Sequence, residues 1–258
     1  MSSEETEKTG DTGEPGKTDG KADGKADERT DTRTSGPAPD PEARGLRLVP
    51  VLLALTVVSG LIDAVSYLGL EHVFTANMTG NVVVLGFAAA GAPGFSVSHT
   101  LTSLGAFLVG AVAGGRIAVR LGKGSRRTWA RLTLAAEAVL VGAASVVGFA
   151  APDATATVYT LIAVTAFAMG LRNATVRKLG VPDLTTTVLT MTLTGLASDS
   201  RAAGGTAHHS PRRTASVIAM LAGALLGAWL VLNHGLAIPL LVAAGVVGVL
   251  AVTASGRE

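Results

Sequence analysis

The sequence predicts an all-α membrane protein with about six full transmembrane helices and two short re-entrant or broken segments. Three observations carry this prediction. The mean hydropathy is +0.46, although the first 44 residues are almost wholly polar. Six apolar runs reach the roughly 20 residues that a membrane-spanning helix needs. Two shorter apolar runs carry several Asn and Thr side chains, which enter hydrocarbon only where protein or water gives them partners.

The leader, residues 1–44, differs in composition from the rest of the chain. It holds 7 Lys/Arg and 12 Asp/Glu, a net charge of −5, whereas residues 45–258 hold 14 and 7, a net charge of +7, which together give the formal charge of +2. The leader has no aromatic residue, so it cannot bury enough apolar surface to offset the entropy of ordering. We expect a disordered acidic tail, and its length and polarity exclude a cleavable signal peptide.

The transmembrane domain is expected over residues 45–254, followed by a short tail at 255–258. The six candidate spans lie near residues 48–70, 98–119, 131–150, 155–176, 213–232 and 236–254. The two shorter segments are residues 74–91, which open with an Asn/Thr cluster, and residues 184–198, which are rich in Thr. Each is either a weak span or a segment that enters and leaves on one side.

An internal repeat relates the two halves, residues 46–150 and 155–254. Three motifs recur in the same order at offsets of 110 to 113 residues: Gly60-Leu-Ile-Asp-Ala with Gly170-Leu-Arg-Asn-Ala, Thr79-Gly-Asn with Thr190-Met-Thr, and Gly110-x-x-x-Gly114 with Gly223-x-x-x-Gly227. Three spans per half is an odd number, so the halves are predicted to run in opposite directions through the bilayer. Such inverted repeats with interrupted segments are typical of secondary transporters. We expect the two short segments to face each other across a pseudo-two-fold axis.

Loop charges favour this topology. Basic loops stay in the cytoplasm, and the basic residues cluster at four places: before the first span at Arg44 and Arg47, between the third and fourth segments from Arg116 to Arg131, at Arg177 and Lys178, and at Arg212 and Arg213. All four clusters share one side only if both short segments are re-entrant. The sequence therefore predicts a multi-pass protein of the bacterial cytoplasmic membrane with both termini in the cytoplasm.

The same motifs resemble a known family. Gly60-x-x-Asp63, then Phe74-x-x-Asn77-Met78-Thr79-Gly80-Asn81, and later Gly170-Leu171-x-Asn173-Ala174 with Val181-Pro182-Asp183-x-x-Thr186, are similar to the YoaK-type family of bacterial membrane proteins of unknown function. Met191 departs from this pattern, since the family tends to carry Gly there. The resemblance implies a multi-spanning inner-membrane protein and supplies no substrate.

Ionisable residues inside the apolar segments are the first candidates for a site. Asp63 lies roughly two turns from the end of the first span, too deep for a short side chain to reach the interface, and Arg172 with Asn173 occupies the equivalent place in the second half. Asp63 and Arg172 are expected to approach each other, or Asp63 cycles between protonated and charged states. The alternative is a buried pair that only holds helices together. Glu137 follows Arg131 closely enough that its carboxylate is expected to reach the interface.

Amide and hydroxyl side chains form the second group of candidates. Asn77 and Asn81 are four residues apart and form one stripe near Thr79, and Thr186, Thr190 and Thr194 repeat this spacing in the second half. These side chains either bind a polar solute or ion, or they cap helices and bond to the backbone. Seven glycines are expected to allow close packing: Gly60, Gly80, Gly110, Gly114, Gly170, Gly223 and Gly227.

The motifs of common enzyme classes are missing from the sequence. It contains no nucleotide-binding loop, no HExxH helix, no Gly-x-Ser-x-Gly turn and no cysteine. His208-His209 could hold a metal ion, but Asp199 is the one carboxylate near these histidines in the sequence. We therefore expect no metal and no cofactor. The basic stretch from Arg116 to Arg131 suits anionic lipid headgroups rather than nucleic acid, and a homo-oligomer is compatible with the sequence. The expected function is transport of a small solute coupled to a proton or ion gradient, and the alternative is a scaffold or sensor acting through its tail.

Overall fold

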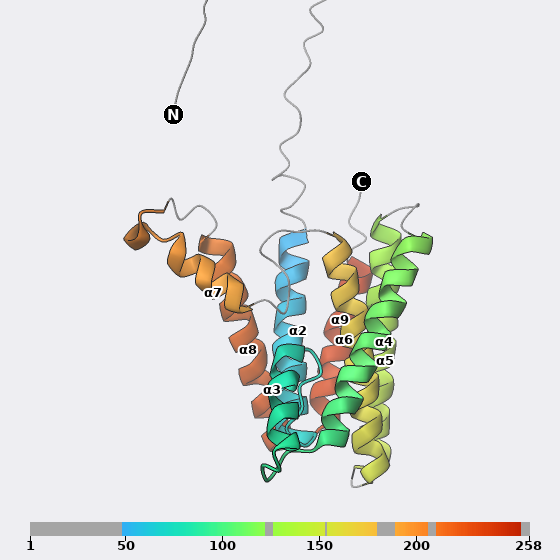
Figure 1. Ribbon diagram of the computed structural model, residues 1–258. Coiled ribbons are helices and arrows are strands. Elements are labelled where there is room, and N and C mark those ends of the chain that lie inside the picture. Colours follow the sequence, from blue (N-terminus) through green and yellow to red (C-terminus); the bar gives the residue numbers. More distant parts are fainter. Residues whose placement is uncertain (1–47, 122–125, 153, 180–188, 206–209, 254–258) are drawn as a thin grey trace, which may run out of the picture. The chain divides into compact units, whose positions relative to one another are not determined.

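The computed structural model describes residues 48–121, 126–152, 154–179, 189–205 and 210–253. These residues form eight α-helices and one short 3-10 helix, with no strand among them (Figure 1). The elements are α2 (Leu48–Gly69), α3 (Met78–Ala89), α4 (Val97–Leu121), α5 (Arg126–Ala150), α6 (Thr155–Leu179), α7 (Leu189–Ser198), η1 (Arg201–Ala203), α8 (Ser210–His234) and α9 (Ala237–Thr253). The leader and the tail at 255–258 lie outside the described residues.

Five of the described helices are long and apolar enough to cross a membrane, namely α2, α4, α5, α6 and α8. This agrees with five of the six expected spans. The sixth, α9, has 17 residues and measures about 25 Å, less than the roughly 30 Å of a hydrocarbon core. A turn at Gly235, with φ of +74°, separates α9 from α8.

Two pairs of long helices pack with their backbones in direct contact, because glycines face the partner helix. In the α2–α8 pair, a Cβ on Gly60 would lie 2.3 Å from the carbonyl oxygen of Met220, and a Cβ on Gly223 would lie 1.9 Å from that of Val57. In the α4–α6 pair, a Cβ on Gly110 would lie 2.1 Å from the carbonyl oxygen of Phe167. Gly114, Gly170 and Gly227 are packed in the same way. Helices approach this closely only through small residues.

The third pair is α5 with α9. Near one end of the pair, Arg131 Nε donates to the carbonyl oxygen of Ala251 at 3.2 Å, and near the other Ser145 Oγ donates to that of Ala237 at 2.8 Å. Buried apolar residues from α2, α5, α6 and α9 meet in one core, including Val58, Val141, Ile162 and Val247. This core holds the three pairs together as one bundle, in which the polar sites described below are buried.

The chain between α2 and α3 folds back into the bundle without regular structure. Glu71 and His72 have φ values of 59° and 57°, a left-handed conformation that is unfavourable for residues with a Cβ and that reverses the chain in a short distance. Leu70 before this turn and Val73 and Thr75 after it are fully buried. Residues 70–77 therefore place non-helical backbone inside the protein, as the prediction of a re-entrant or broken segment requires.

The two short helices occupy different places. Among the described residues, α3 packs against α4, α7 packs against α8, and α3 and α7 do not contact each other. Figure 1 shows α3 in the lower half of the bundle and α7 at the upper end. The prediction that these segments face each other is therefore wrong for their described parts.

Candidate functional site

The buried segment between α2 and α3 is held by side chains that supply its backbone with hydrogen-bond partners. Asp63 Oδ1 accepts from the amides of Ala76 at 2.8 Å and Asn77 at 3.3 Å. Asn81 Oδ1 accepts from the amide of Phe74 at 2.8 Å, and its Nδ2 donates to the carbonyl oxygen of the same residue at 2.6 Å. Buried backbone groups outside helices need such partners, because an unpaired one costs about 1 to 3 kcal/mol.

Ser103 of α4 completes this arrangement. Its hydroxyl donates to the carbonyl oxygen of Phe74 at 2.6 Å and accepts from Asn81 Nδ2 at 3.0 Å. Asn77 caps α3, since its side chain accepts from the amide of Gly80 at 3.3 Å. A Cβ on residue 80 would lie 2.7 Å from the ring of Phe74, so glycine is the residue that fits there. We call Asp63, Asn81 and Ser103 the loop clamp, since together they hold residues 74–77.

Replacement of Asn81 by alanine is expected to lower the free energy of unfolding by about 2 kcal/mol, because it leaves the buried amide of Phe74 without its partner. Thermal unfolding of the purified protein in detergent measures this change. Thr79→Ala is the matched control, since Thr79 lies two residues away in the same helix and is exposed. Equal stability of the two variants would contradict the role of Asn81 in the loop clamp.

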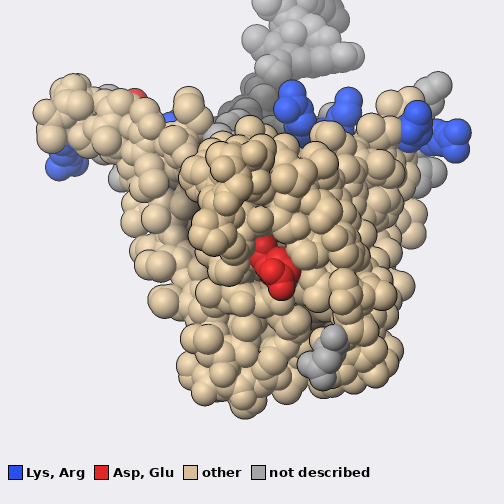
Figure 2. Space-filling view, turned by 60° about the horizontal axis from the view of Figure 1, so that its bottom comes forward, with Lys and Arg blue, Asp and Glu red and all other residues tan. Residues whose placement is uncertain are grey.

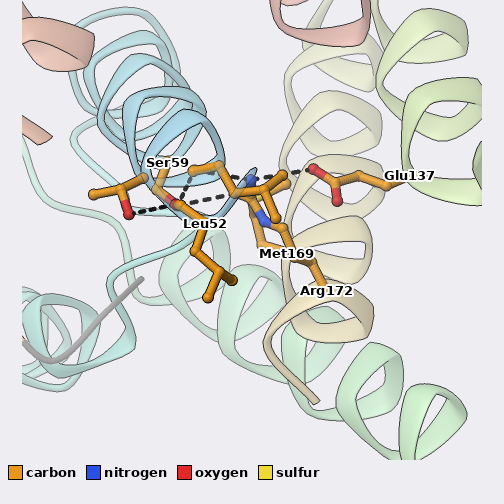
Figure 3. Close-up of polar contacts among 7 residues, drawn as sticks. Leu52, Ser59, Glu137, Met169 and Arg172 are labelled. Atoms are coloured by element: carbon orange, nitrogen blue, oxygen red, sulfur yellow. Dashed lines mark hydrogen bonds and ion pairs between the residues drawn. The ribbon is translucent and has the colours of Figure 1, made fainter. Parts of the chain in front are cut away.

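A second polar site lies where α2, α5 and α6 meet, and Arg172 of α6 is at its centre (Figure 3). Its side chain is 1% exposed. Nη1 donates to the carbonyl oxygen of Leu55 at 3.1 Å, and Nη2 donates to Ser59 Oγ at 3.1 Å and to Met169 Sδ at 2.6 Å. Arg172 therefore ties α6 to α2 through hydrogen bonds to backbone and hydroxyl.

Glu137 of α5 forms the ion pair of this site. Its Oε1 lies 3.4 Å from Arg172 Nη1, and its side chain is fully buried. Neither carboxylate oxygen of Glu137 has a hydrogen-bond partner among the described residues. Glu137 also lies 11 residues into α5, about 16 Å along the helix axis, close to the middle of a bilayer core. We call Glu137, Arg172 and Ser59 the ion-pair site.

The geometry defines the partners of the ionisable residues. Arg172 forms its ion pair with Glu137, whereas the Asp63 carboxylate, which also experiences the charge of Arg172, bonds to the amides of residues 76 and 77. The expectation that Glu137 reaches the interface is wrong, because the side chain faces the protein interior from the α5 surface that packs against α6. A carboxylate so deep needs a cationic partner, and Arg172 provides it.

The other predicted site residues are spread over the fold. Thr79 is exposed and Asn173 is half-buried on α6. Thr190 is exposed on α7, where its carbonyl oxygen accepts from the hydroxyl of Thr194 at 2.9 Å, the local back-bonding that Thr often makes in helices. Thr186 and His208-His209 lie outside the described residues. Among the described residues, no group of three or more His, Cys, Asp or Glu side chains is placed to hold a metal ion.

Ser59, Ser103 and Glu137 were not predicted as site residues. Ser59 stands directly before Gly60, whose close packing against α8 fixes the rotation of α2. Glu137 is the one acidic residue of α5, and this isolation within an apolar helix is the sequence signal that could have marked it. Nothing in the sequence sets Ser103 apart from the other hydroxyl residues near the start of α4.

The long apolar helices and the buried ionisable side chains between them define a polytopic helical membrane protein. Residues 51–253 match the model of a family described as "Protein of unknown function (DUF1275)", and the chain belongs to this family. It is also similar to the "UPF0700 transmembrane protein YoaK" of Bacillus subtilis (strain 168), with 34% identity over 152 residues. This alignment covers 58% of the chain and 65% of the relative, so the chain aligns with less than two thirds of that protein. No solved structure matches the chain. The YoaK-type resemblance is thereby confirmed.

Proposed function

We propose that the protein is a secondary transporter that moves a small solute across the bacterial cytoplasmic membrane, coupled to a proton or ion gradient. The observation that carries this proposal is the burial of Asp63, Glu137 and Arg172 between membrane-length helices, beside the non-helical segment of residues 70–77. Ionisable side chains inside a membrane domain are expensive, and they usually mark solute or proton pathways. Non-helical backbone at that depth is typical of transporter binding sites.

Helix packing supports the inverted repeat on which the transporter proposal draws. The sequence repeat makes α2 equivalent to α6, α4 to α8 and α5 to α9. If each helix is replaced by its equivalent in the other half, the α2–α8 contact becomes the α6–α4 contact. The glycine contacts follow the same rule: Gly223 meets Val57 as Gly110 meets Phe167, and Gly227 meets Leu61 as Gly114 meets Leu171. The residue numbers of equivalent residues differ by 110 or 113, and both values occur among the offsets of the sequence repeat. Alternating access then corresponds to rocking of these pairs around the buried sites.

A sixth crossing by α9 is part of the proposal. Although α9 is short, its hydrogen bonds to Arg131 and Ser145 lie near the two ends of α5, so it runs along most of a membrane-length helix. A slightly short span is accommodated by local thinning of the bilayer or by its flanking residues. The bundle then has six crossings and the two short helices α3 and α7.

The charge distribution supports an orientation with both termini in the cytoplasm. In Figure 2 the Lys and Arg side chains gather along the upper rim. Exposed basic residues of this end are Arg116, Arg120, Arg131, Arg177 and Lys178. Under the positive-inside rule this end faces the cytoplasm, and its side chains meet anionic headgroups there.

Single cysteines test this orientation, because the chain has none of its own. Cysteines at Thr128 and Ala202 are expected to react only after a membrane-permeant thiol reagent is added to cells, since both residues are exposed near the basic end. A cysteine at Pro93, in the exposed turn after α3, is expected to react with an impermeant reagent. Labelling of all three positions by the impermeant reagent would contradict the proposed orientation.

The transport proposal is tested by comparing metabolites in cells with and without the protein, followed by uptake into vesicles of each compound that changes. We expect a compound whose accumulation in vesicles requires an ion gradient and is lost in Asp63→Asn or Arg172→Gln. A matched set of vesicles with Thr79→Ala should retain uptake. If no compound changes in cells and no gradient-driven uptake occurs, the transporter proposal is wrong.

The alternative is a membrane scaffold or sensor that acts through its tail, and the charge of residues 1–44 favours it. This leader carries a net charge of −5 and stands before a domain with a net charge of +7. Deletion of residues 1–44 separates the two functions. A transporter keeps its uptake without the leader, whereas a scaffold loses its cellular phenotype while the domain remains in the membrane. Neither function requires catalysis, and we propose no enzymatic activity.

A further inference from the structure

We infer that Glu137 is the binding site for a coupling proton, and that its protonation removes the charge attraction that links α5 to Arg172 of α6. This inference rests on the proposed function, because it names the ion that drives transport and the residue that carries it. It assigns to Glu137 the role that the sequence suggested for Asp63. The proton comes from the aqueous phase and adds to a carboxylate oxygen, so a buried anion becomes a neutral acid.

The first argument is the isolation of the Glu137 carboxylate. It is fully buried, both of its oxygens lack hydrogen bonds among the described residues, and its stabilisation depends on the Arg172 guanidinium at 3.4 Å. Burial without hydrogen-bond donors disfavours the charged form of a carboxyl group. Addition of a proton to Glu137 therefore removes a charge without breaking any hydrogen bond that this carboxylate accepts.

The second argument is that Arg172 keeps its place when Glu137 becomes neutral. The guanidinium retains its hydrogen bonds to Leu55, Ser59 and Met169, which lie on α2 and on α6 itself. None of these three partners belongs to α5. The charge attraction to Glu137 is consequently the interaction that links α5 to Arg172. Protonation of Glu137 removes this attraction, whereas the hydrogen bonds between α6 and α2 remain.

Asp63 is the competing carboxylate, and its surroundings differ. Its Oδ1 accepts from two backbone amides, and the amide of Thr75 faces the same carboxylate. Among the described residues, its Oδ2 alone lacks a hydrogen bond, whereas both oxygens of Glu137 lack one. Amide donors favour the charged form. Protonation of Asp63 would weaken the hydrogen bonds that hold the re-entrant segment, so we assign Asp63 a constant structural role as a member of the loop clamp.

The balance of buried charge agrees with one proton per protein. Asp63, Glu137 and Arg172 are the buried ionisable residues of the described chain, two carboxylates and one guanidinium, so the unprotonated set carries one excess negative charge. Apolar surroundings disfavour net charge. A proton on Glu137 leaves Asp63 and Arg172 as opposite charges within one bundle.

No other described group competes for the interaction with Glu137. Of the helices packed against α5, α9 has no ionisable side chain, and Arg172 of α6 is the charged group that acts on Glu137. The ionisable residues of α4 are His99, Arg116 and Arg120, and those of α6 besides Arg172 are Tyr159, Arg177 and Lys178, all within about three turns of a helix end. On α5 itself, Arg131 bonds to the Ala251 carbonyl oxygen of α9.

Infrared spectroscopy of the purified full-length protein during a pH titration tests the inference. A buried carboxylic acid without hydrogen bonds absorbs at a higher frequency than a hydrated one, so Glu137 is separable from the exposed acidic residues. We expect such a band to grow as the pH falls, to persist in Asp63→Asn and to be absent from Glu137→Gln. In the wild-type protein, ¹³C labelling of glutamate should shift the band and ¹³C labelling of aspartate should leave it in place.

Each outcome decides the inference. A band that remains in Glu137→Gln, that shifts with labelled aspartate, or that never forms over the pH range in which the protein stays folded would overturn it. The isotope labelling needs no variant, so a folding defect in Glu137→Gln does not block the test. If the band fails to appear but gradient-driven uptake persists, the proton assignment is wrong and the transporter proposal stands. If the band behaves as expected but no solute is transported, the proposed function fails and the coupling role falls with it, although Glu137 is still shown to bind a proton.

Discussion

Arg172→Gln is expected to lower the free energy of unfolding by about 3 to 5 kcal/mol at neutral pH, the usual result of removing one partner from a buried ion pair. The substitution leaves Glu137 and Asp63 as two buried carboxylates without a buried cation. It also removes the hydrogen bonds that link α6 to Leu55 and Ser59. Thermal or denaturant unfolding in detergent, followed by circular dichroism, measures the loss.

The matched variant is Glu137→Gln, and its expected effect is much smaller. It leaves Asp63 and Arg172 as opposite charges, and Arg172 keeps its hydrogen bonds to α2. The double variant Arg172→Gln with Glu137→Gln is expected to be more stable than Arg172→Gln alone, because it lacks the uncompensated carboxylate. A double-mutant cycle gives the coupling energy. Additive effects of the two substitutions would contradict the ion pair.

The defect of Arg172→Gln is also expected to shrink as the pH falls. Protonation removes the charge from the carboxylates that Arg172 no longer compensates, so the folded variant regains stability relative to the wild-type protein. The difference in the free energy of unfolding becomes smaller at low pH because the folded variant takes up protons. Unfolding of both proteins at several pH values measures this difference. A difference in stability that is independent of pH would mean that the lost hydrogen bonds, rather than the uncompensated charge, cause the defect.

The positions of the helices follow closely from the apolar runs, because the length of a hydrophobic run is set by the membrane. The expected span at residues 155–176 is α6, Thr155–Leu179, and the expected span at 98–119 is α4, Val97–Leu121. The contact surfaces of α4 and α8 could also be predicted, since two glycines spaced four residues apart mark a helix face that another backbone can approach. The bounds of α9, Ala237–Thr253, likewise lie within one residue of the expected span at 236–254.

The partners of the buried polar residues could not be predicted in the same way. Whether Glu137 reaches lipid headgroups or the protein interior depends on the rotation of α5, which the packing against α6 and α9 determines. Asp63 bonds to amides 13 and 14 residues further along the chain because the strained turn at Glu71 and His72 returns the chain beside α2. Both facts depend on tertiary structure. The sequence could nominate Asp63, Asn81 and Arg172, but not the groups that they contact.

Gly110→Ala is expected to lower the free energy of unfolding by about 3 kcal/mol, the upper part of the usual range for overpacking. The new Cβ would lie 2.1 Å from the carbonyl oxygen of Phe167 and about 3.0 Å from its Cα, so the backbones of α4 and α6 must separate. Backbone cannot move aside as a flexible side chain can. Unfolding in detergent measures the change, and Gly223→Ala in the α2–α8 pair should behave alike.

Gly115→Ala is the control that isolates this effect, since Gly115 lies in the same helix as Gly110 and a Cβ there meets no atom within 4 Å. Alanine favours a helix over glycine by roughly 1 kcal/mol, so this variant should be as stable as the wild-type protein or slightly more stable. If the two substitutions change the free energy of unfolding in opposite directions, helix propensity is excluded as the cause, since propensity acts alike at both positions. The contact between backbones is then the explanation. Equal effects at Gly110 and Gly115 would contradict that contact between α4 and α6.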